Sequence, residues 1–137
     1  MIKGITIHNT GNDYSAQELY DLLVQTKSTN VYHYIIDEKE VVNLLSEDEM
    51  AYHTGKGYDF GNRYTLAIAI ARSTSEEPIY LQAQDRAVKF IKKLLKKYDL
   101  TTDDIFFHRD FDIQSTCPHR IIQIYKTKER FLNECFL

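Results

Sequence analysis

The sequence has little cysteine, no long apolar run and no excess of basic residues, and each of these absences excludes a class of protein. Its two cysteines, Cys117 and Cys135, are too few for the disulfide framework of a small secreted protein. The longest apolar run, Leu66 to Ala71, has six residues, whereas about 20 are needed to span a bilayer. Seventeen Lys and Arg against twenty Asp and Glu give a net charge of −3, which argues against a general nucleic-acid-binding protein.

Signals for targeting and for domain boundaries are also missing from the sequence. The first residues, MIKGITIH, contain no charged region followed by a long apolar stretch, so we expect synthesis in a cytoplasm without a signal peptide. No internal repeat, low-complexity tract or Pro/Ser-rich linker divides the chain. The 137 residues, 43% of them hydrophobic, therefore predict one globular domain over residues 1–137 with its own core.

Strand and helix patterns alternate along the chain. Apolar or alternating segments predict strands at 3–8, 64–71 and 105–108, and two runs at 31–36 and 41–45 predict a hairpin. Helices are expected at 15–26, where Ser15 and Glu18 form a capping box, at 78–98 and near 126–133, with a single helical turn at 46–50. This order predicts an α/β fold with a central mixed β-sheet flanked by helices.

Lysines gather on one side of the helix expected at 78–98, opposite its apolar stripe. No aromatic residues interleave with them, so we interpret this side as a solvated face rather than a nucleic-acid-binding surface. The five residues are Lys89, Lys92, Lys93, Lys96 and Lys97. Cys135, in the terminal segment FLNECFL, is expected to have an apolar packing role.

Two of the expected strands, ITIH and IFFH, end in a histidine, and Cys117 follows the second histidine by nine residues. Two imidazoles and a thiolate suit zinc, and three protein ligands leave a fourth position open, as catalytic zinc sites do. His8, His108 and Cys117 are therefore a candidate zinc site. By spacing alone the alternative stays open that each histidine is an ordinary hydrogen-bonded surface or core residue.

Five segments in a fixed order carry a resemblance: ITIHNTG, VYHYIID, AYHTG, NRYTLAIAI and HRDFDIQSTCP. In this order they resemble the type-2 N-acetylmuramoyl-L-alanine amidases, a family that includes phage lysozyme-type amidases, endolysins and peptidoglycan recognition proteins. The resemblance extends from residue 2 to about 120. It implies that His8, His108 and Cys117 bind a catalytic zinc ion. It also implies hydrolysis of the amide between the lactyl group of N-acetylmuramic acid and L-alanine in bacterial peptidoglycan.

The same resemblance assigns catalytic roles to Tyr32, His53 and Ser115. Tyr32 matches a tyrosine that donates a hydrogen bond to the oxyanion or to the zinc-bound water. His53 matches a histidine that lines the substrate cleft and contacts the stem peptide or the oxyanion. Ser115 stands where the related branch has Lys or Thr, and it brings a hydrogen-bond donor without a positive charge. Some members carry a glutamate base at the position of Ala69, so this chain resembles the branch that relies on tyrosine instead.

Supporting roles are expected for several neighbouring residues. His33 alternates away from Tyr32 along its strand and is expected to be a packed support, and Asn62 to shape the loop into the central strand. Asp110 or Asp112 either orients a ligand histidine or caps its own loop. His119 stands where the family often has Gly, and it either approaches the cleft or is exposed.

Other readings of the sequence concern binding and location. A non-catalytic peptidoglycan-binding recognition module is the main alternative, and the presence of Cys117 argues against it. Nothing in the sequence supports or excludes a regulatory protein partner. We expect no membrane and no nucleic acid as partners. An enzyme of this kind, from a phage, a prophage or an autolytic host system, would reach the cell wall only after holin-dependent release or lysis.

Overall fold

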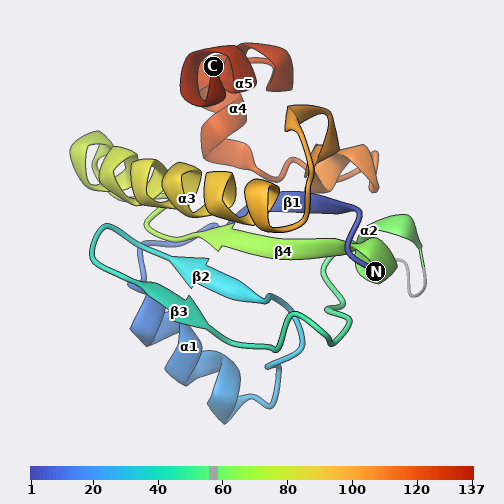
Figure 1. Ribbon diagram of the computed structural model, residues 1–137. Helices are drawn as coiled ribbons and strands as arrows, with labels where there is room; N and C mark the ends of the chain where they lie inside the picture. Colours follow the sequence, from blue (N-terminus) through green and yellow to red (C-terminus); the bar gives the residue numbers. More distant parts are fainter. Residues whose placement is uncertain (56–58) are drawn as a thin grey trace.

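A five-stranded mixed sheet organises the computed structural model, which describes residues 1–55 and 59–137 (Figure 1). The strand order is β3-β2-β4-β1-β5. Four strands are parallel, and β3 pairs antiparallel with β2 in the predicted hairpin. The strands are β1 (Gly4–Asn9), β2 (Tyr34–Ile36), β3 (Val41–Asn43), β4 (Thr65–Ile70) and β5 (Ile105–Phe107).

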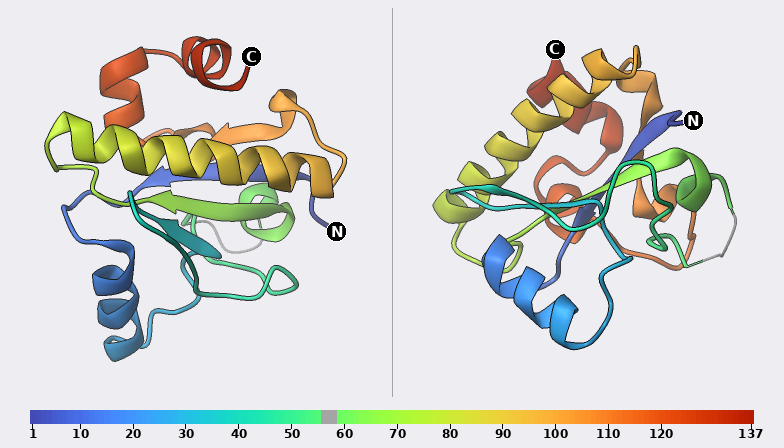
Figure 2. Two further views of the ribbon diagram at one scale, coloured as in Figure 1. Left: turned by 60° about the vertical axis from the view of Figure 1, so that its left-hand side comes forward. Right: turned by 60° about the horizontal axis from the view of Figure 1, so that its bottom comes forward.

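Helices cover both faces of this sheet, as predicted for the α/β class. Figures 1 and 2 show α3, α4 and α5 on one side and α1 on the other, with α2 at the start of β4. Among the described helices, none combines the length and the apolar character needed to cross a membrane. The helices are α1 (Ala16–Gln25), α2 (Phe60–Tyr64), α3 (Glu77–Lys97), α4 (His119–Tyr125) and α5 (Lys128–Phe136), with short 3₁₀ turns at Thr102–Asp104 and His108–Asp110.

The alternation along β1 separates the hydrophobic core from the chemistry. Ile5 and Ile7 are fully buried in the larger core cluster, against α3, α4 and α5. Thr6 and His8 therefore face the opposite side of the sheet, as predicted. On that side a smaller cluster includes Ala69 of β4 and packs against α1. The central strand β4 is buried along its whole length, which is why its sequence is almost continuously apolar.

Local sequence signals were accurate in some places and wrong in others. The capping box of Ser15 and Glu18 forms and opens α1. The helical turn expected at 46–50 is wrong, because these residues form a turn in which the Glu49 amide donates to the Ser46 carbonyl. The helix expected near 126–133 is also wrong in its bounds, since Lys126 has a φ of +72° and separates α4 from α5. Part of the loop expected before the central strand, residues 56–58, lies outside the described residues.

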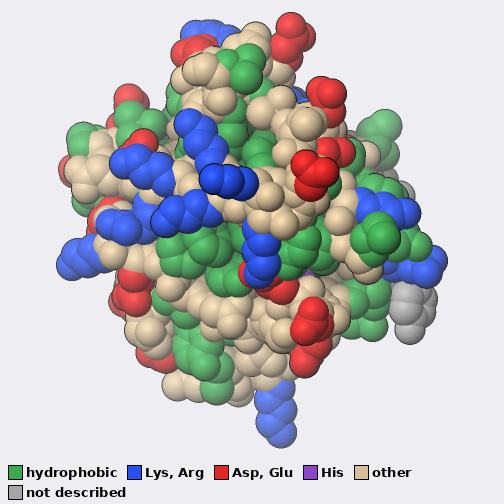
Figure 3. Space-filling model, in the orientation of Figure 1, with side chains coloured by type: hydrophobic (Ala, Val, Ile, Leu, Met, Phe, Trp, Pro, Cys, Tyr) green, Lys and Arg blue, Asp and Glu red, His purple; other side chains and the backbone are tan. Residues whose placement is uncertain are grey.

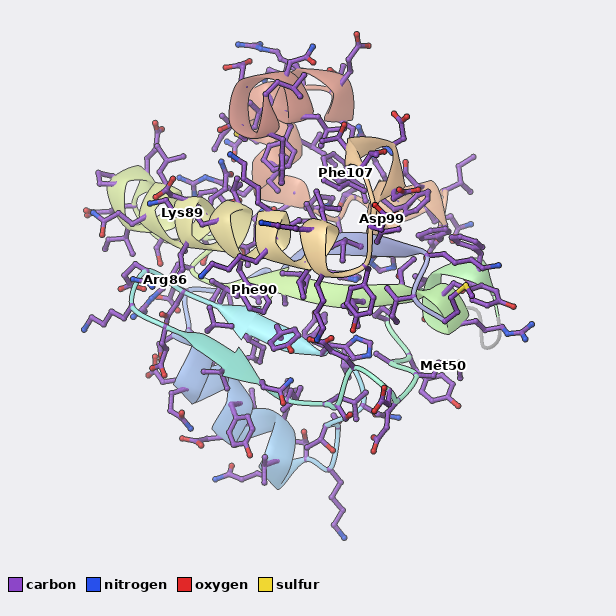
Figure 4. The ribbon with its side chains drawn as sticks, viewed as in Figure 1. Met50, Arg86, Lys89, Phe90, Asp99 and Phe107 are labelled. Atoms are coloured by element: carbon purple, nitrogen blue, oxygen red, sulfur yellow. The ribbon has the colours of Figure 1, made fainter. Side chains whose placement is uncertain are left out.

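The lysines of α3 are exposed, as predicted for a solvated face, and Figure 3 shows basic side chains gathered over this helix. Beneath them a groove of about 590 Å³ runs between α3 and the hairpin. Arg86 and Phe90 reach from α3 toward the hairpin (Figure 4), and Lys89, Val41 and Leu81 also line the groove. This groove lies on the α3 face, and the sheet separates it from His8.

Candidate metal centre and active site

The fold brings together the three ligands predicted from the sequence. His8 lies near the end of β1, and His108 directly follows the neighbouring parallel strand β5, so their ring centroids are 4.9 Å apart. Cys117, in the loop before α4, places its Sγ 3.6 Å from Nδ1 of His8. One ligand atom from each of the three residues lies within 4.8 Å of the other two. The sheet therefore brings together His8 and His108, which are one hundred residues apart in the sequence.

The chemistry of these donors fits a zinc ion. Burial lowers the pKa of His8 well below its usual value, with His53 and His108 adding to the effect, so the His8 imidazole keeps a lone pair at neutral pH. In the described part of the chain no group hydrogen-bonds to the buried Nε2 of His108. Burial also raises the pKa of the Cys117 thiol to about 11. A thiolate there requires a positive partner, which a divalent metal supplies.

Tyr32 lies beside this cluster, in the position that the family resemblance implied. Its ring centroid lies 5.3 Å from that of His8, and the side chain is half-buried. Burial, with a smaller effect of Cys117, raises the pKa of the phenol to about 12. The hydroxyl therefore stays protonated at neutral pH, and it is available as a hydrogen-bond donor next to the candidate metal ligands.

His53 is buried beside His8 and does not line an open cleft. It is 5% exposed. Its Nδ1 is 2.8 Å from Nε2 of His8, and its Nε2 is 3.0 Å from the carbonyl oxygen of Gly61. Burial lowers the pKa of His53 to about 4. Both ring nitrogens are thus engaged within the protein.

Ser115 shapes the loop that presents Cys117. Its Oγ accepts a hydrogen bond from the Cys117 amide at 3.1 Å, and its own amide donates to the Asp112 carbonyl. The charge of Asp112 raises the pKa of His108 against the larger, lowering effect of burial. Asp110 instead caps its loop, because its Oδ2 accepts from the Phe107 amide and from Lys128.

The structure also shows the contacts of the residues for which supporting roles were predicted. His33 is 1% exposed and bridges two backbone groups, as expected for a packed support. Oδ1 of Asn62 accepts from the amides of His53 and Thr54, at 2.8 and 3.0 Å, and so shapes the loop as predicted. His119 takes neither predicted position, since it is half-buried and its Nε2 lies 2.9 Å from Oγ of Ser73. Cys135 packs against the larger core cluster, as expected.

Asn9 was missed by the sequence reading. Its Oδ1 accepts from the amides of Arg120 and Ile121 at the start of α4, and its Nδ2 donates to the Tyr80 hydroxyl. Its carbonyl oxygen lies 3.7 Å from Sγ of Cys117. Asn9 therefore joins the strand that carries His8 to the segment that carries Cys117. A polar residue directly after a strand-end histidine was the available signal.

Comparisons with known proteins identify the family and the fold of this chain. Residues 1–120 match the N-acetylmuramoyl-L-alanine amidase family. The N-acetylmuramoyl-L-alanine amidase XlyB of Bacillus subtilis is 36% identical over 119 residues, which are 86% of this chain and 37% of XlyB. CwlA of the same organism, also an N-acetylmuramoyl-L-alanine amidase, is 35% identical over 119 residues, 86% of this chain and 43% of CwlA. The PlyG catalytic domain superposes with a TM-score of 0.86 at 25% identity, covering 96% of this chain and 79% of that one.

These matches define a class, and the chain belongs to the N-acetylmuramoyl-L-alanine amidase family. The predicted fold class is confirmed as well, since PlyL has the same fold at a TM-score of 0.87 with 24% identity, over 96% of this chain and 82% of the other. The chain spans less than half the length of the curated relatives XlyB and CwlA.

Proposed function

We propose that this chain is a zinc-dependent N-acetylmuramoyl-L-alanine amidase domain over residues 1–137. Its substrate is the amide between the lactyl group of N-acetylmuramic acid and L-alanine in bacterial peptidoglycan. The observation that carries the proposal is the convergence of His8, His108 and Cys117, with ligand atoms within 4.8 Å of one another, beside the ring of Tyr32. Zinc held by these residues supplies Lewis-acid chemistry, which polarises an amide carbonyl and makes water more acidic.

Tyr32 is the group of this chain that faces charge developing on the carbonyl oxygen. Its phenol keeps its proton at neutral pH, because burial raises its pKa to about 12. A protonated donor that is already in place stabilises an oxyanion without reorganising during the reaction, and Tyr32 lies just before β2. Ser115 acts on the same site indirectly, because its hydroxyl holds the Cys117 amide in place.

Digestion of purified peptidoglycan, with mass spectrometry of the soluble fragments, tests the proposal. Free stem peptides beginning at L-alanine are the expected product. New reducing sugar ends would instead identify a glycosidase. A protein that binds peptidoglycan but releases nothing would be the recognition module, the alternative that the presence of Cys117 disfavours.

The cellular setting is part of the same proposal. We expect the domain to be made in the cytoplasm and to act on the wall after holin-dependent release or lysis, in a phage, prophage or autolytic enzyme. Peptidoglycan is its proposed partner, with no role for nucleic acid or membrane. A pull-down from host lysate would detect a regulatory protein partner if there is one.

A further inference from the structure

A chain of hydrogen bonds leads from the backbone of α2 to the ligand His8. Its first member is the Gly61 carbonyl oxygen, which can only accept. A side chain does not fit at residue 61, because a Cβ there would lie 2.6 Å from Cγ2 of Thr54, and the carbonyl is fixed by this close packing. Nε2 of His53 lies 3.0 Å from this oxygen and must therefore carry the proton.

Thr65 strengthens the same assignment. Its hydroxyl donates to the Gly61 carbonyl at 2.6 Å, so its oxygen, and not its hydrogen, faces Nε2 of His53 at 3.4 Å. Both neighbours of that nitrogen are acceptors. A neutral His53 with its proton on Nε2 has a lone pair on Nδ1, which lies 2.8 Å from Nε2 of His8. His8 consequently donates from Nε2, and its Nδ1 keeps the lone pair.

Nδ1 of His8 faces Cys117, another of the candidate ligands, and lies 3.6 Å from its Sγ. We propose that His53 is a positioning residue, which sets the tautomer and the ring orientation of His8 so that Nδ1 of His8 is the metal ligand. This role replaces the expected contact between His53 and the substrate. The inference rests on the metal site of the proposed function, and it does not depend on which bond the enzyme cleaves.

His33 provides a natural comparison within the same domain. Its Nδ1 accepts from the Ala67 amide at 2.9 Å, and its Nε2 donates to the Glu49 carbonyl at 2.7 Å. The tautomer is the same as that assigned to His53, and the side chain is equally buried. Both partners of His33 are backbone groups, however, so its replacement disturbs packing without touching a ligand. His33 variants are therefore matched controls for His53 variants.

The tautomers can be read directly by long-range ¹H–¹⁵N correlation of the histidine rings in the zinc-loaded protein. We expect the proton on Nε2 in both His8 and His53, with Nδ1 of His8 shifted by zinc. A proton on Nδ1 of His8, or zinc at its Nε2, would overturn the proposal. So would a His53 ring without a proton on Nε2.

Variants of His53 test the energetic consequence, with zinc affinity measured by competition with a chelator. His53→Asn keeps an acceptor where Nδ1 stood, whereas His53→Gln keeps only the donor toward Gly61. Loss of such an outer partner costs about 10- to 100-fold in metal affinity. We expect that loss in His53→Leu and His53→Gln, and near wild-type affinity in His53→Asn and in the control His33→Gln.

Two outcomes would contradict the assignment. Equal losses in His53→Asn and His53→Gln would mean that packing, not the acceptor at Nδ1, supports the site. Wild-type affinity in His53→Gln would mean that His8 needs no partner. If His53→Leu fails to fold, the comparison of zinc affinity between His53→Asn and His53→Gln still tests the assignment. Both measurements concern metal binding, so a protein that binds zinc as expected but releases no stem peptide fails only the proposed function.

Discussion

Ala69 of β4 lies directly opposite His8 of β1 in the register of the two parallel strands. Residues in register share a face of the sheet, so the Ala69 methyl occupies the position from which a longer side chain would reach the candidate metal ligands. It packs instead in the small cluster that includes Tyr32. A carboxylate base is therefore absent from this position. A variant that lacks the Tyr32 hydroxyl is consequently the most informative test of the catalytic proposal.

Replacement of Tyr32 by phenylalanine removes one hydrogen-bond donor and keeps the ring. If the phenol stabilises the oxyanion, turnover should fall by ~10²-fold or more, about 3 kcal/mol, with zinc content and melting temperature nearly unchanged. Stem-peptide release from peptidoglycan is the measurement. Wild-type turnover in this variant would reduce Tyr32 to a packing residue and return attention to Ser115.

Metal content provides the second prediction. The protein should bind about one zinc ion per chain through His8, His108 and Cys117, and Cys117→Ser should lose most of it, which metal analysis of purified protein can measure. Because the core is built from the sheet and α3, chelation should abolish activity and leave the circular dichroism spectrum largely intact. Undiminished zinc in Cys117→Ser would remove Cys117 from the ligand set, and global unfolding on chelation would make the metal structural as well.

The order of the strands along the chain and the candidate metal ligands could be predicted because their signals are local, although the strand expected at 31–36 forms only over Tyr34–Ile36. The apolar run of β4 and the strand-end positions of His8 and His108 are visible as short patterns, and a parallel sheet necessarily brings neighbouring strand ends together. The family resemblance then indicated which of these patterns belong to one site. The turn at 46–50 was misread because helical propensity says little about four or five residues, whose conformation is set by tertiary contacts.

The position of His53 could not be predicted in the same way. The segment AYHTG does not reveal that the imidazole turns inward, because that depends on the Gly61 carbonyl in the first turn of α2 and on Nε2 of His8. The role of Asn9 was equally hidden, since its partners are more than 70 residues away along the chain. Hydrogen bonds across elements are consequences of packing, and a single sequence carries no periodicity that marks them.

Asn9 yields a prediction about stability. Asn9→Ala removes the acceptor for the first amides of α4 and the donor to Tyr80, so the free energy of unfolding should fall by ~1–3 kcal/mol. Urea denaturation measures it. Asn9→Asp keeps the acceptor and should lose less. Equal stability of wild type and Asn9→Ala would show that water replaces these bonds at no cost.

The pH dependence of the metal-free protein follows from its buried histidines. Burial lowers the pKa of His8, His33 and His53 in the folded state, to about 4 for His53, whereas the unfolded chain binds protons at about 6.5. Below pH 6.5 the unfolded state therefore holds more protons than the folded state. Stability should fall as the pH drops from 6.5 toward 5, by up to about 1.4 kcal/mol per pH unit for each such histidine.

Urea denaturation in the presence of a chelator, between pH 7.5 and 5.0, measures this slope. The window lies above the range in which carboxyl groups titrate, so the histidines dominate it. Replacing one of the three should make the dependence shallower, and His33→Gln does so without altering the candidate metal ligands. A flat profile between pH 6.5 and 5 would mean that these imidazoles already accept protons in the folded state, and so would contradict the hydrogen-bond chain from Gly61 through His53 to His8.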